Sequence, residues 1–485
     1  MHAETPRSDA GVVRAVVRGW PRWAALGAFG FLVVTWLARP WTAGDTPFVL
    51  DGTNALLDCL SNHDFVACRK SEHLDYWGLM SPMGDWPPYQ YLVDMVSIGL
   101  GADEHNDREL VLSTLGVAGV VSSVALGWAV LSRVGQKAWF WGFLAVVLSG
   151  PIIVYARSTA GEALASGLLV CVVAATVLRA RPPLVALAVF GACLTKETAY
   201  PFVAALGLLG LVLARRRTGE PIRSHVLWGA GGILASFTLA ALFNVVRFGS
   251  IFNTNYLQPE LHTPGVARKL DYAVALFASP SGGMLVFWPA ASALLGAACL
   301  LPLLARERRL DRRPALVLVA VVALLALGFA SWWTPFGWAG YGPRLTMPWV
   351  PALVLLALAA YGDPLAELAR RLLAATWRLL LVACAVLALA LPHVGYMWKV
   401  SSIGDFFRPN CDAPWRIGVH EFHRCQHELM WSRRPAGTYA IRGLGTAGGA
   451  ATSVVLAAGI LGSLLAFRAA LTAPASTLPA RPKPA

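Results

Sequence analysis

The feature that most constrains this chain is a series of apolar stretches, each as long as a membrane's hydrocarbon layer is thick. A helix needs roughly 20 mostly apolar residues to cross that layer, and windows of this size predict about twelve spans. They are predicted near 23–39, 110–131, 138–155, 162–178, 183–196, 199–214, 226–246, 283–304, 314–333, 345–361, 372–391 and 449–467. The sequence therefore predicts an all-α, polytopic membrane protein.

The charge content agrees with this prediction. Only 14% of the residues are charged, whereas soluble domains carry about 25%. This excludes an ordinary soluble enzyme, a disordered protein and a small disulfide-rich secreted domain. The net charge of +13 would suit a nucleic-acid partner, but membrane topology explains it better, and no nucleic acid is expected.

The basic residues are distributed as a multi-pass topology requires. If the N-terminus is cytoplasmic, the short inside segments hold 23 of the 40 Lys and Arg residues and 7 of the 27 acids. Short cytoplasmic loops carry such an excess of Lys and Arg, so both termini are expected in the cytoplasm. The Arg-rich, Lys-poor composition suggests a bacterial source, and hence the bacterial cytoplasmic membrane.

Two outer loops are long and divide the chain. Residues 1–391 are expected to form the transmembrane module, whose first outer loop, 40–109, contains amphipathic helices. Residues 392–448 form the last outer loop, 449–467 the final span, and 468–485 a disordered cytoplasmic tail.

Four cysteines fall in these two outer loops, on the oxidising side of the membrane. One disulfide per loop is predicted, Cys59–Cys68 and Cys411–Cys425, with pairing between the loops as the alternative. The other four lie in spans and are expected to be packing residues: Cys171, Cys193, Cys299 and Cys384.

Polar side chains gather in four clusters at the predicted outer ends of the spans. The clusters are Gly44-Asp45-Thr46-Pro47, Arg157 with Glu162, Lys196-Glu197-Thr198, and Trp332 through Arg344. A carboxylate can act as a general base on a hydroxyl, Lys and Arg neutralise phosphate, and tryptophans stack on sugar rings. Because the outer face lacks nucleotide sugars, a transferase there would take its sugar from a polyprenyl phosphate in the bilayer.

The order of these motifs resembles the GT-C superfamily of integral-membrane glycosyltransferases. It is similar to the bacterial relatives of protein O-mannosyltransferases and of the lipid A aminoarabinose transferase. The matching segments are Gly44-Asp45-Thr46-Pro47 with the helical stretch after it, Arg157 to Glu162, Thr195-Lys196-Glu197, Phe248-Gly249-Ser250 with Tyr256, Ser279 to Pro289, and Trp338 to Arg344.

The resemblance implies a GT-C-like fold and transfer that inverts the anomeric centre. It assigns the general base to Asp45, a second acid to Glu162, and contacts with the donor phosphate to Lys196 and Arg344. Many members have a second acid close to the first, but here Thr46 follows Asp45 and the next acid is Asp51. No cofactor is therefore expected, a divalent metal is not supported, and Asp51 is a rival base.

Further residues are weaker candidates. Arg247 could also bind the donor phosphate, and substrate contacts are expected from Asp51, Arg157, Trp338, Tyr341 and Tyr256.

Structural roles compete with these assignments. They are an N-cap for Asp45, a solvated helix face for Asp51, an ion pair with Arg157 for Glu162, snorkelling for Lys196, interface anchoring for Arg344 and a helix end for Arg247.

His420, His423 and His427 share one helix face and could bind zinc, but surface histidines in a disulfide-tied loop are the preferred interpretation.

The residues together predict transfer of one sugar from a polyprenyl-phosphate donor to an acceptor hydroxyl on the extracytoplasmic face. The acceptor would be a cell-envelope glycan, lipid or protein. A secondary transporter or lipid flippase is the alternative. It would place ionisable groups near the midplane and show paired halves, whereas here such groups cluster at one face. A non-enzymatic scaffold is a third reading.

Overall fold

The computed structural model describes residues 46–63, 87–102, 104–159, 161–196, 199–253, 257, 259–304, 310–336, 342–399, 411, 417–432 and 442–472. Within these ranges the chain is a bundle of helices without a named strand, and an isolated β-bridge joins His262 to Trp332.

The helices follow the chain in this order. They are α2 (Thr46–Asn62), α4 (Pro88–Gly99), α5 (His105–Arg133), α6 (Trp139–Leu148), α7 (Ile152–Ala156), α8 (Glu162–Val177), α9 (Pro182–Leu194), α10 (Tyr200–Thr218), α11 (Arg223–Phe248), η3 (Pro259–Leu261), α12 (Val266–Ala278), α13 (Met284–Phe287), α14 (Pro289–Leu304), α15 (Arg313–Ala330), η4 (Met347–Trp349), α16 (Val350–Leu373), α17 (Thr376–Lys399), α19 (Val419–Trp431) and α21 (Ala447–Thr472).

Apolar length identifies the membrane-crossing helices. Within the described ranges, α5, α11, α15, α16 with η4, α17 and α21 are long and apolar enough to cross a membrane, and α6, α8, α9 and α14 are shorter apolar helices. Eleven of the twelve predicted spans coincide with helices, while the first, 23–39, lies outside the described residues. The predicted class, an all-α polytopic membrane protein, is confirmed.

Two of the predicted spans are broken into unequal helices. Residues 138–155 divide into α6 and α7 around Ser149-Gly150-Pro151, and 283–304 divide into α13 and α14 at Trp288, before Pro289. The two breaks meet, because the fully buried Trp288 indole donates from Nε1 to the Val146 carbonyl at 2.7 Å. A Cβ at Gly150 would lie 2.1 Å from this ring, so the indole fills the space that glycine leaves.

Small residues let α5 and α8 approach closely, as is usual between membrane helices. A Cβ at Gly119 would lie 2.3 Å from the Ala163 carbonyl oxygen, and one at Gly167 would lie 2.8 Å from the Gly119 Cα. This contact holds the first turn of α8, which begins at Glu162, against the middle of α5.

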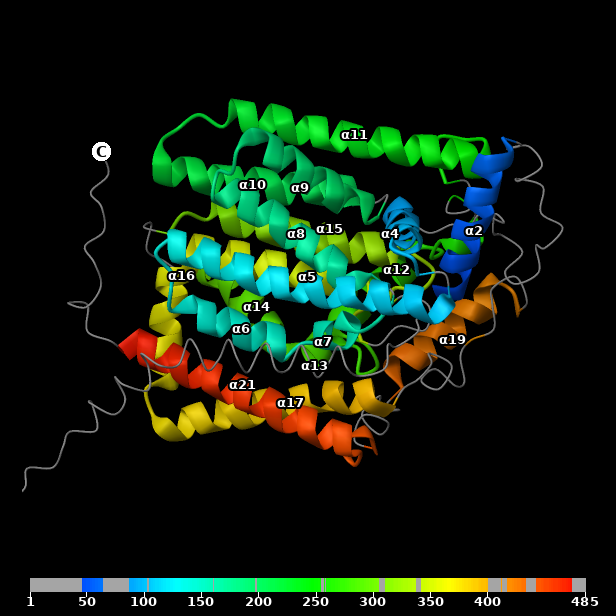
Figure 1. Cartoon of the computed structure of the whole chain (residues 1–485). Coiled ribbons are helices and arrows are strands. Elements are labelled where there is room, and N and C mark those ends of the chain that lie inside the picture. Colours follow the sequence, from blue (N-terminus) through cyan, green and yellow to red (C-terminus); the bar gives the residue numbers. More distant parts are fainter. Residues whose placement is uncertain are drawn as a thin grey trace, which may run out of the picture.

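The helices run roughly side by side, so their connections collect at two ends (Figure 1). At the arginine end, residues of the short connections contact each other or nearby helices through Gln136–Asp363 (2.8 Å), Arg179–Glu220 (3.1 Å), Arg216–Asp311 and Arg468 with the Ala374 carbonyl (3.1 Å). The opposite end, called the α2 end below, carries α2, α4, α12 and α19. This arrangement agrees with the predicted alternation of basic connections; the side of the membrane that each end faces stays a prediction.

Candidate functional site

The connection between α7 and α8 contacts α2, α5 and α17. Ser113 of α5 donates its hydroxyl to the Arg157 carbonyl at 2.9 Å, which fixes the backbone of this connection. The Arg157 side chain is buried, and its Nη1 donates to the carbonyl of Met397 on α17. Arg157 thus joins the α7–α8 connection to α17, which is distant in sequence.

The start of α2 contacts the same connection. The hydroxyls of Thr46 and Thr159 share a hydrogen bond, and both side chains are buried. Thr46 is the first described residue and follows Asp45 in the sequence. Asp45 itself lies outside the described residues, as do the other candidates Tyr256, Trp338 and Tyr341.

Glu162 and Arg344, predicted separately, are brought together as an ion pair between Oε1 and Nε. Their side chains are 12% and 9% exposed, so the pair is largely removed from solvent. Glu162 occupies the first turn of α8, where the helix dipole stabilises a negative charge. Arg344 is held by a tight turn in which its N–H donates to the Gly342 carbonyl at 2.9 Å.

A tyrosine that the sequence did not indicate covers this ion pair. Gly161, the N-cap of α8, has a φ of +78°, and a Cβ there would lie 2.2 Å from the Tyr89 hydroxyl oxygen. Burial, and then the charge of Glu162, raise the pKa of the Tyr89 phenol above its ordinary value. Tyr89 is therefore a neutral hydroxyl beside a carboxylate and a guanidinium. In the sequence, Tyr89 is one aromatic residue among several in the predicted first outer loop, and nothing there marks it as part of the site.

Arg247, in the last turn of α11, contacts α4 through Tyr91. Its buried guanidinium donates to the Asn244 side-chain oxygen at 2.7 Å. The guanidinium carbon lies 4.4 Å from the Phe243 ring centre, 4.8 Å from that of Phe248 and 5.4 Å from that of Tyr91. Tyr91, which contacts Arg247, and Tyr89, which lies against Gly161, are two residues apart on α4.

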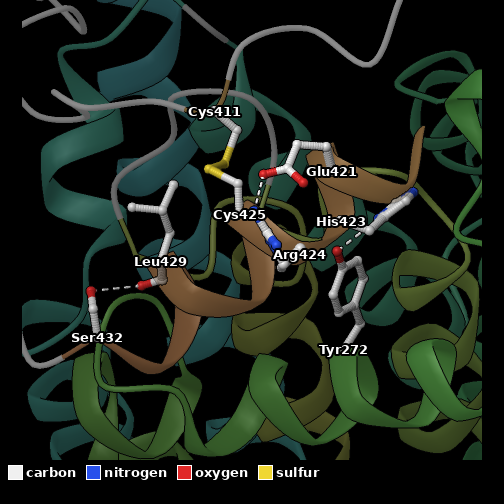
Figure 2. Close-up of a disulfide and its surroundings, with 8 residues drawn as sticks. All are labelled: Tyr272, Cys411, Glu421, His423, Arg424, Cys425, Leu429 and Ser432. Carbon is white, nitrogen blue, oxygen red and sulfur yellow. Dashed lines mark hydrogen bonds and ion pairs between the residues drawn. A yellow bond between two sulfur atoms is a disulfide. The ribbon is translucent and has the colours of Figure 1, made fainter. Parts of the chain in front are cut away.

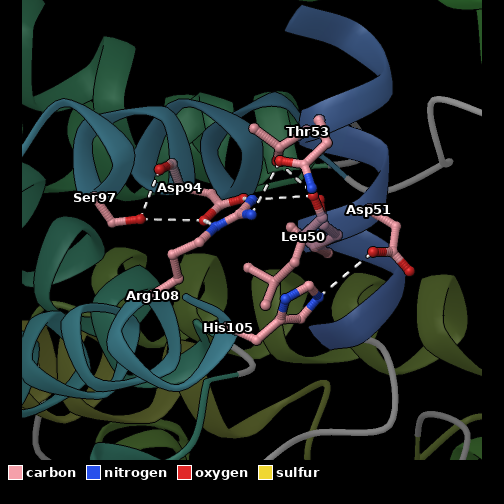
Figure 3. A network of polar contacts seen from close by, with 9 residues as sticks. Leu50, Asp51, Thr53, Asp94, Ser97, His105 and Arg108 are labelled. Carbon is pink, nitrogen blue, oxygen red and sulfur yellow. Dashed lines mark hydrogen bonds and ion pairs between the residues drawn. The ribbon is translucent and has the colours of Figure 1, made fainter. Parts of the chain in front are cut away.

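Lys196 and Asp51 occupy separate positions. The half-buried Lys196, after α9, places its Nζ 5.2 Å from the ring centre of Phe329 in the last turn of α15. Asp51 is 69% exposed and lies 3.4 Å from His105 Nε2 (Figure 3). Its side chain projects from the exposed face of α2, whereas Thr46 is on the buried face.

The last outer segment packs on α12 through a disulfide-tied helix. The predicted bridge Cys411–Cys425 is confirmed (Figure 2). Cys59 is also disulfide-bonded, while its predicted partner Cys68 lies outside the described residues. The four cysteines predicted to be packing residues are free.

The histidines of α19 contact α12. His423 Nδ1 lies 2.8 Å from the Tyr272 hydroxyl, and His427 Nδ1 lies 2.7 Å from Asp271. Among the described residues, no group of three or more His, Cys, Asp or Glu side chains is placed to hold a metal ion. The prediction of surface histidines is wrong for His423, which is buried because it packs against α12, whereas His427 stays partly exposed beside Asp271.

Comparisons with known proteins find similarity in structure alone. No protein-family model and no curated protein matches the chain. ArnT from Cupriavidus metallidurans in the apo state is 19% identical, with 93% of this chain and 77% of that chain covered and a TM-score of 0.49. The same protein bound to undecaprenyl phosphate is also 19% identical, with 92% and 77% covered and a TM-score of 0.46.

Proposed function

We propose that this protein is a membrane glycosyltransferase that moves one sugar from a polyprenyl-phosphate donor to an acceptor hydroxyl. The reaction would take place at the α2 end, on the extracytoplasmic face of a bacterial cytoplasmic membrane. The acceptor class is a cell-envelope glycan, lipid or protein.

The observation that carries the proposal is the pairing of Glu162 with Arg344 beside Tyr89 and the start of α2. An arginine presents a planar set of N–H donors that suits a phosphate. A carboxylate in contact with that arginine holds it in one orientation before the substrate arrives. The motif order supports the same assignment, since it places the acid, the Lys and the late Arg in that order in three different predicted outer segments.

The proposed chemistry is a single inverting displacement. The carboxylate of Asp45 accepts the proton of the acceptor hydroxyl while the new bond from that oxygen to the anomeric carbon forms. The bond from the anomeric carbon to the phosphate oxygen breaks, and the polyprenyl phosphate leaves as an anion. Arg344, Lys196 and Arg247 are the candidates to neutralise this anion. The contact between Thr46 and Thr159 supports a base next to the α7–α8 connection.

The distribution of buried charge favours an enzyme over a transporter. Within the described ranges, the buried Asp and Arg side chains lie on α4 (Asp94), in the first turn of α5 (Arg108), in the α7–α8 connection (Arg157), in the last turn of α11 (Arg247) and before η4 (Arg344). The buried His225 is in the first turn of α11, against the Ala180 carbonyl. A transporter would need ionisable groups reachable from both sides.

The test is transfer by the purified protein in lipid nanodiscs, with radiolabelled polyprenyl-phosphate sugars as donors and a cell-envelope extract as acceptor. We expect wild type to label the extract, Asp45→Asn to lose transfer, and Asp58→Asn to retain it, because Asp58 is an exposed acid on α2, the helix that follows Asp45 in the sequence. Wild-type transfer by Asp45→Asn would move the base elsewhere, with Asp51→Asn as the next variant. Absence of transfer with every donor would refute the proposed function.

A further inference from the structure

A buried arginine outside the predicted site joins three helices at the α2 end. Arg108, in the first turn of α5, is only 2% exposed, and its partner Asp94 on α4 is fully buried. Arg108 Nε donates to Asp94 Oδ1 at 2.8 Å, and its Nη2 contacts Oδ2 (Figure 3). Ser97 also donates its hydroxyl to Asp94 Oδ1, at 3.1 Å. The carboxylate is thus fixed by several donors.

The other edge of the same guanidinium reaches α2. Arg108 Nη1 donates to the side-chain oxygen of Asn54, and Nη2 donates to the Leu50 carbonyl, both at 3.0 Å. Leu50 and Asn54 are four residues apart and therefore neighbours along one side of α2. A lysine could not make these contacts together, because its ammonium is a point charge without a planar set of donors.

These contacts fix the rotation of α2 about its own axis and its position along that axis. Thr46 is one helical turn before Leu50 on the same side of α2, so the turn that Arg108 holds continues into the turn that contacts Thr159. Asp45 directly precedes Thr46 in the sequence.

Stability alone is a poor explanation for this network. Burying two charges carries a desolvation penalty, and well-packed apolar side chains in their place are often equally stable or more so. What such side chains cannot supply is the directional attachment of α2 to α4 and α5.

We propose that Arg108, oriented by Asp94, is a positioning residue that seats the start of α2 against the α7–α8 connection. The effect on transfer rests on the proposed function, whereas the placement of α2 does not.

Placement is measured without activity by disulfide trapping. The pair Thr46→Cys and Thr159→Cys is introduced into the full-length protein, and mass spectrometry after mild oxidation gives the yield of the 46–159 cross-link. Four backgrounds are compared: wild type, Arg108→Lys, the apolar double variant Asp94→Leu with Arg108→Met, and Asn54→Ala. Asn62→Ala, an exposed asparagine on the same helix, is the matched control.

We expect a high yield in wild type and Asn62→Ala, a severalfold lower yield in Arg108→Lys and in the double variant, and a smaller fall in Asn54→Ala. The double variant should keep its thermal stability. Without the cysteine pair, its kcat should fall roughly 10- to 100-fold, because displacing a reacting group by about 1 Å has effects of this size, while KM for the donor changes less than about twofold.

Unchanged yield and kcat in the double variant and in Arg108→Lys would overturn the proposal. So would a double variant that loses stability but keeps the kcat of wild type per folded molecule, since that is the behaviour of a purely structural pair. If the double variant does not fold, Asn54→Ala decides, because it removes one contact and leaves the ion pair in place. A lower yield together with no transfer by wild type would support the placement of α2 and refute the proposed function.

Discussion

Removing one member of the Glu162–Arg344 pair should destabilise the protein measurably. Loss of one partner from a fully buried ion pair costs about 3–5 kcal/mol, because the other charge is left without compensation. Here the side chains are 12% and 9% exposed, so the lower figure applies, about 3 kcal/mol for Glu162→Gln or Arg344→Gln. For a chain of this size that corresponds to a fall in Tm of roughly 3–6 °C.

The assay is thermal unfolding in detergent of both single variants and the double variant. The double variant has no isolated charge, so its loss should be smaller than the sum of the single losses by about 2 kcal/mol or more, the signature of direct coupling. The exposed pair Arg370–Glu367 is the matched control, since its side chains are 47% and 49% exposed. Glu367→Gln should change stability by about 0.5 kcal/mol or less.

Additive single losses, or a Glu162→Gln variant as stable as wild type, would refute this reasoning. Either result would mean that the two side chains do not share a desolvated contact. The basis for regarding Glu162 as the group that orients Arg344 would then be lost.

Three further predictions concern the α2 end. Burial lowers the pKa of His423 from 6.5 to about 4. As the pH drops from about 6.5 towards 4, the unfolded chain therefore binds a proton before the folded one does, and stability falls by at most about 3 kcal/mol. The unfolding midpoint should depend less on pH across this range in His423→Gln than in wild type. The bridge Cys411–Cys425 spans 14 residues, so replacing both cysteines with serine should cost about 3 kcal/mol, seen as a lower Tm without reductant. Gly161→Ala combines a φ of +78° with a Cβ that would lie 2.2 Å from a phenol oxygen, so it should lower Tm and transfer together; wild-type values for both would contradict the geometry.

Hydropathy predicted the spans well because a membrane-crossing helix must be apolar over its whole length. It could not predict the breaks at Gly150 and Trp288, because each depends on a helix that is distant in the sequence. Gly150-Pro151 and Trp288-Pro289 are local signals of a break, but that one break fills the other follows only from the packing.

In the candidate site, too, the sequence indicated individual residues but not the contacts between them. The motif order indicated Glu162 and Arg344 individually, but their separation of 182 residues hid the fact that they contact each other. The Arg157 side chain donates to the Met397 carbonyl, a contact between residues 240 positions apart that the sequence could not show. Its contact with substrate stays a prediction. Arg108 gave no signal, because a charge at the start of an apolar helix resembles an ordinary solvated helix end. Asp94 gave none either, because its burial inside α4 depends on contacts with α5.

The indole of Trp288 in the space at Gly150 has a mechanical consequence. Two helices that meet only through smooth apolar surfaces can slip along each other, but a side chain inserted into a gap in its neighbour's backbone blocks that movement. The indole therefore prevents the helices around Gly150, α6 and α7, from sliding past those around Trp288, α13 and α14. Movement within the bundle is therefore expected in segments outside this contact, such as the short helices α2 and α4.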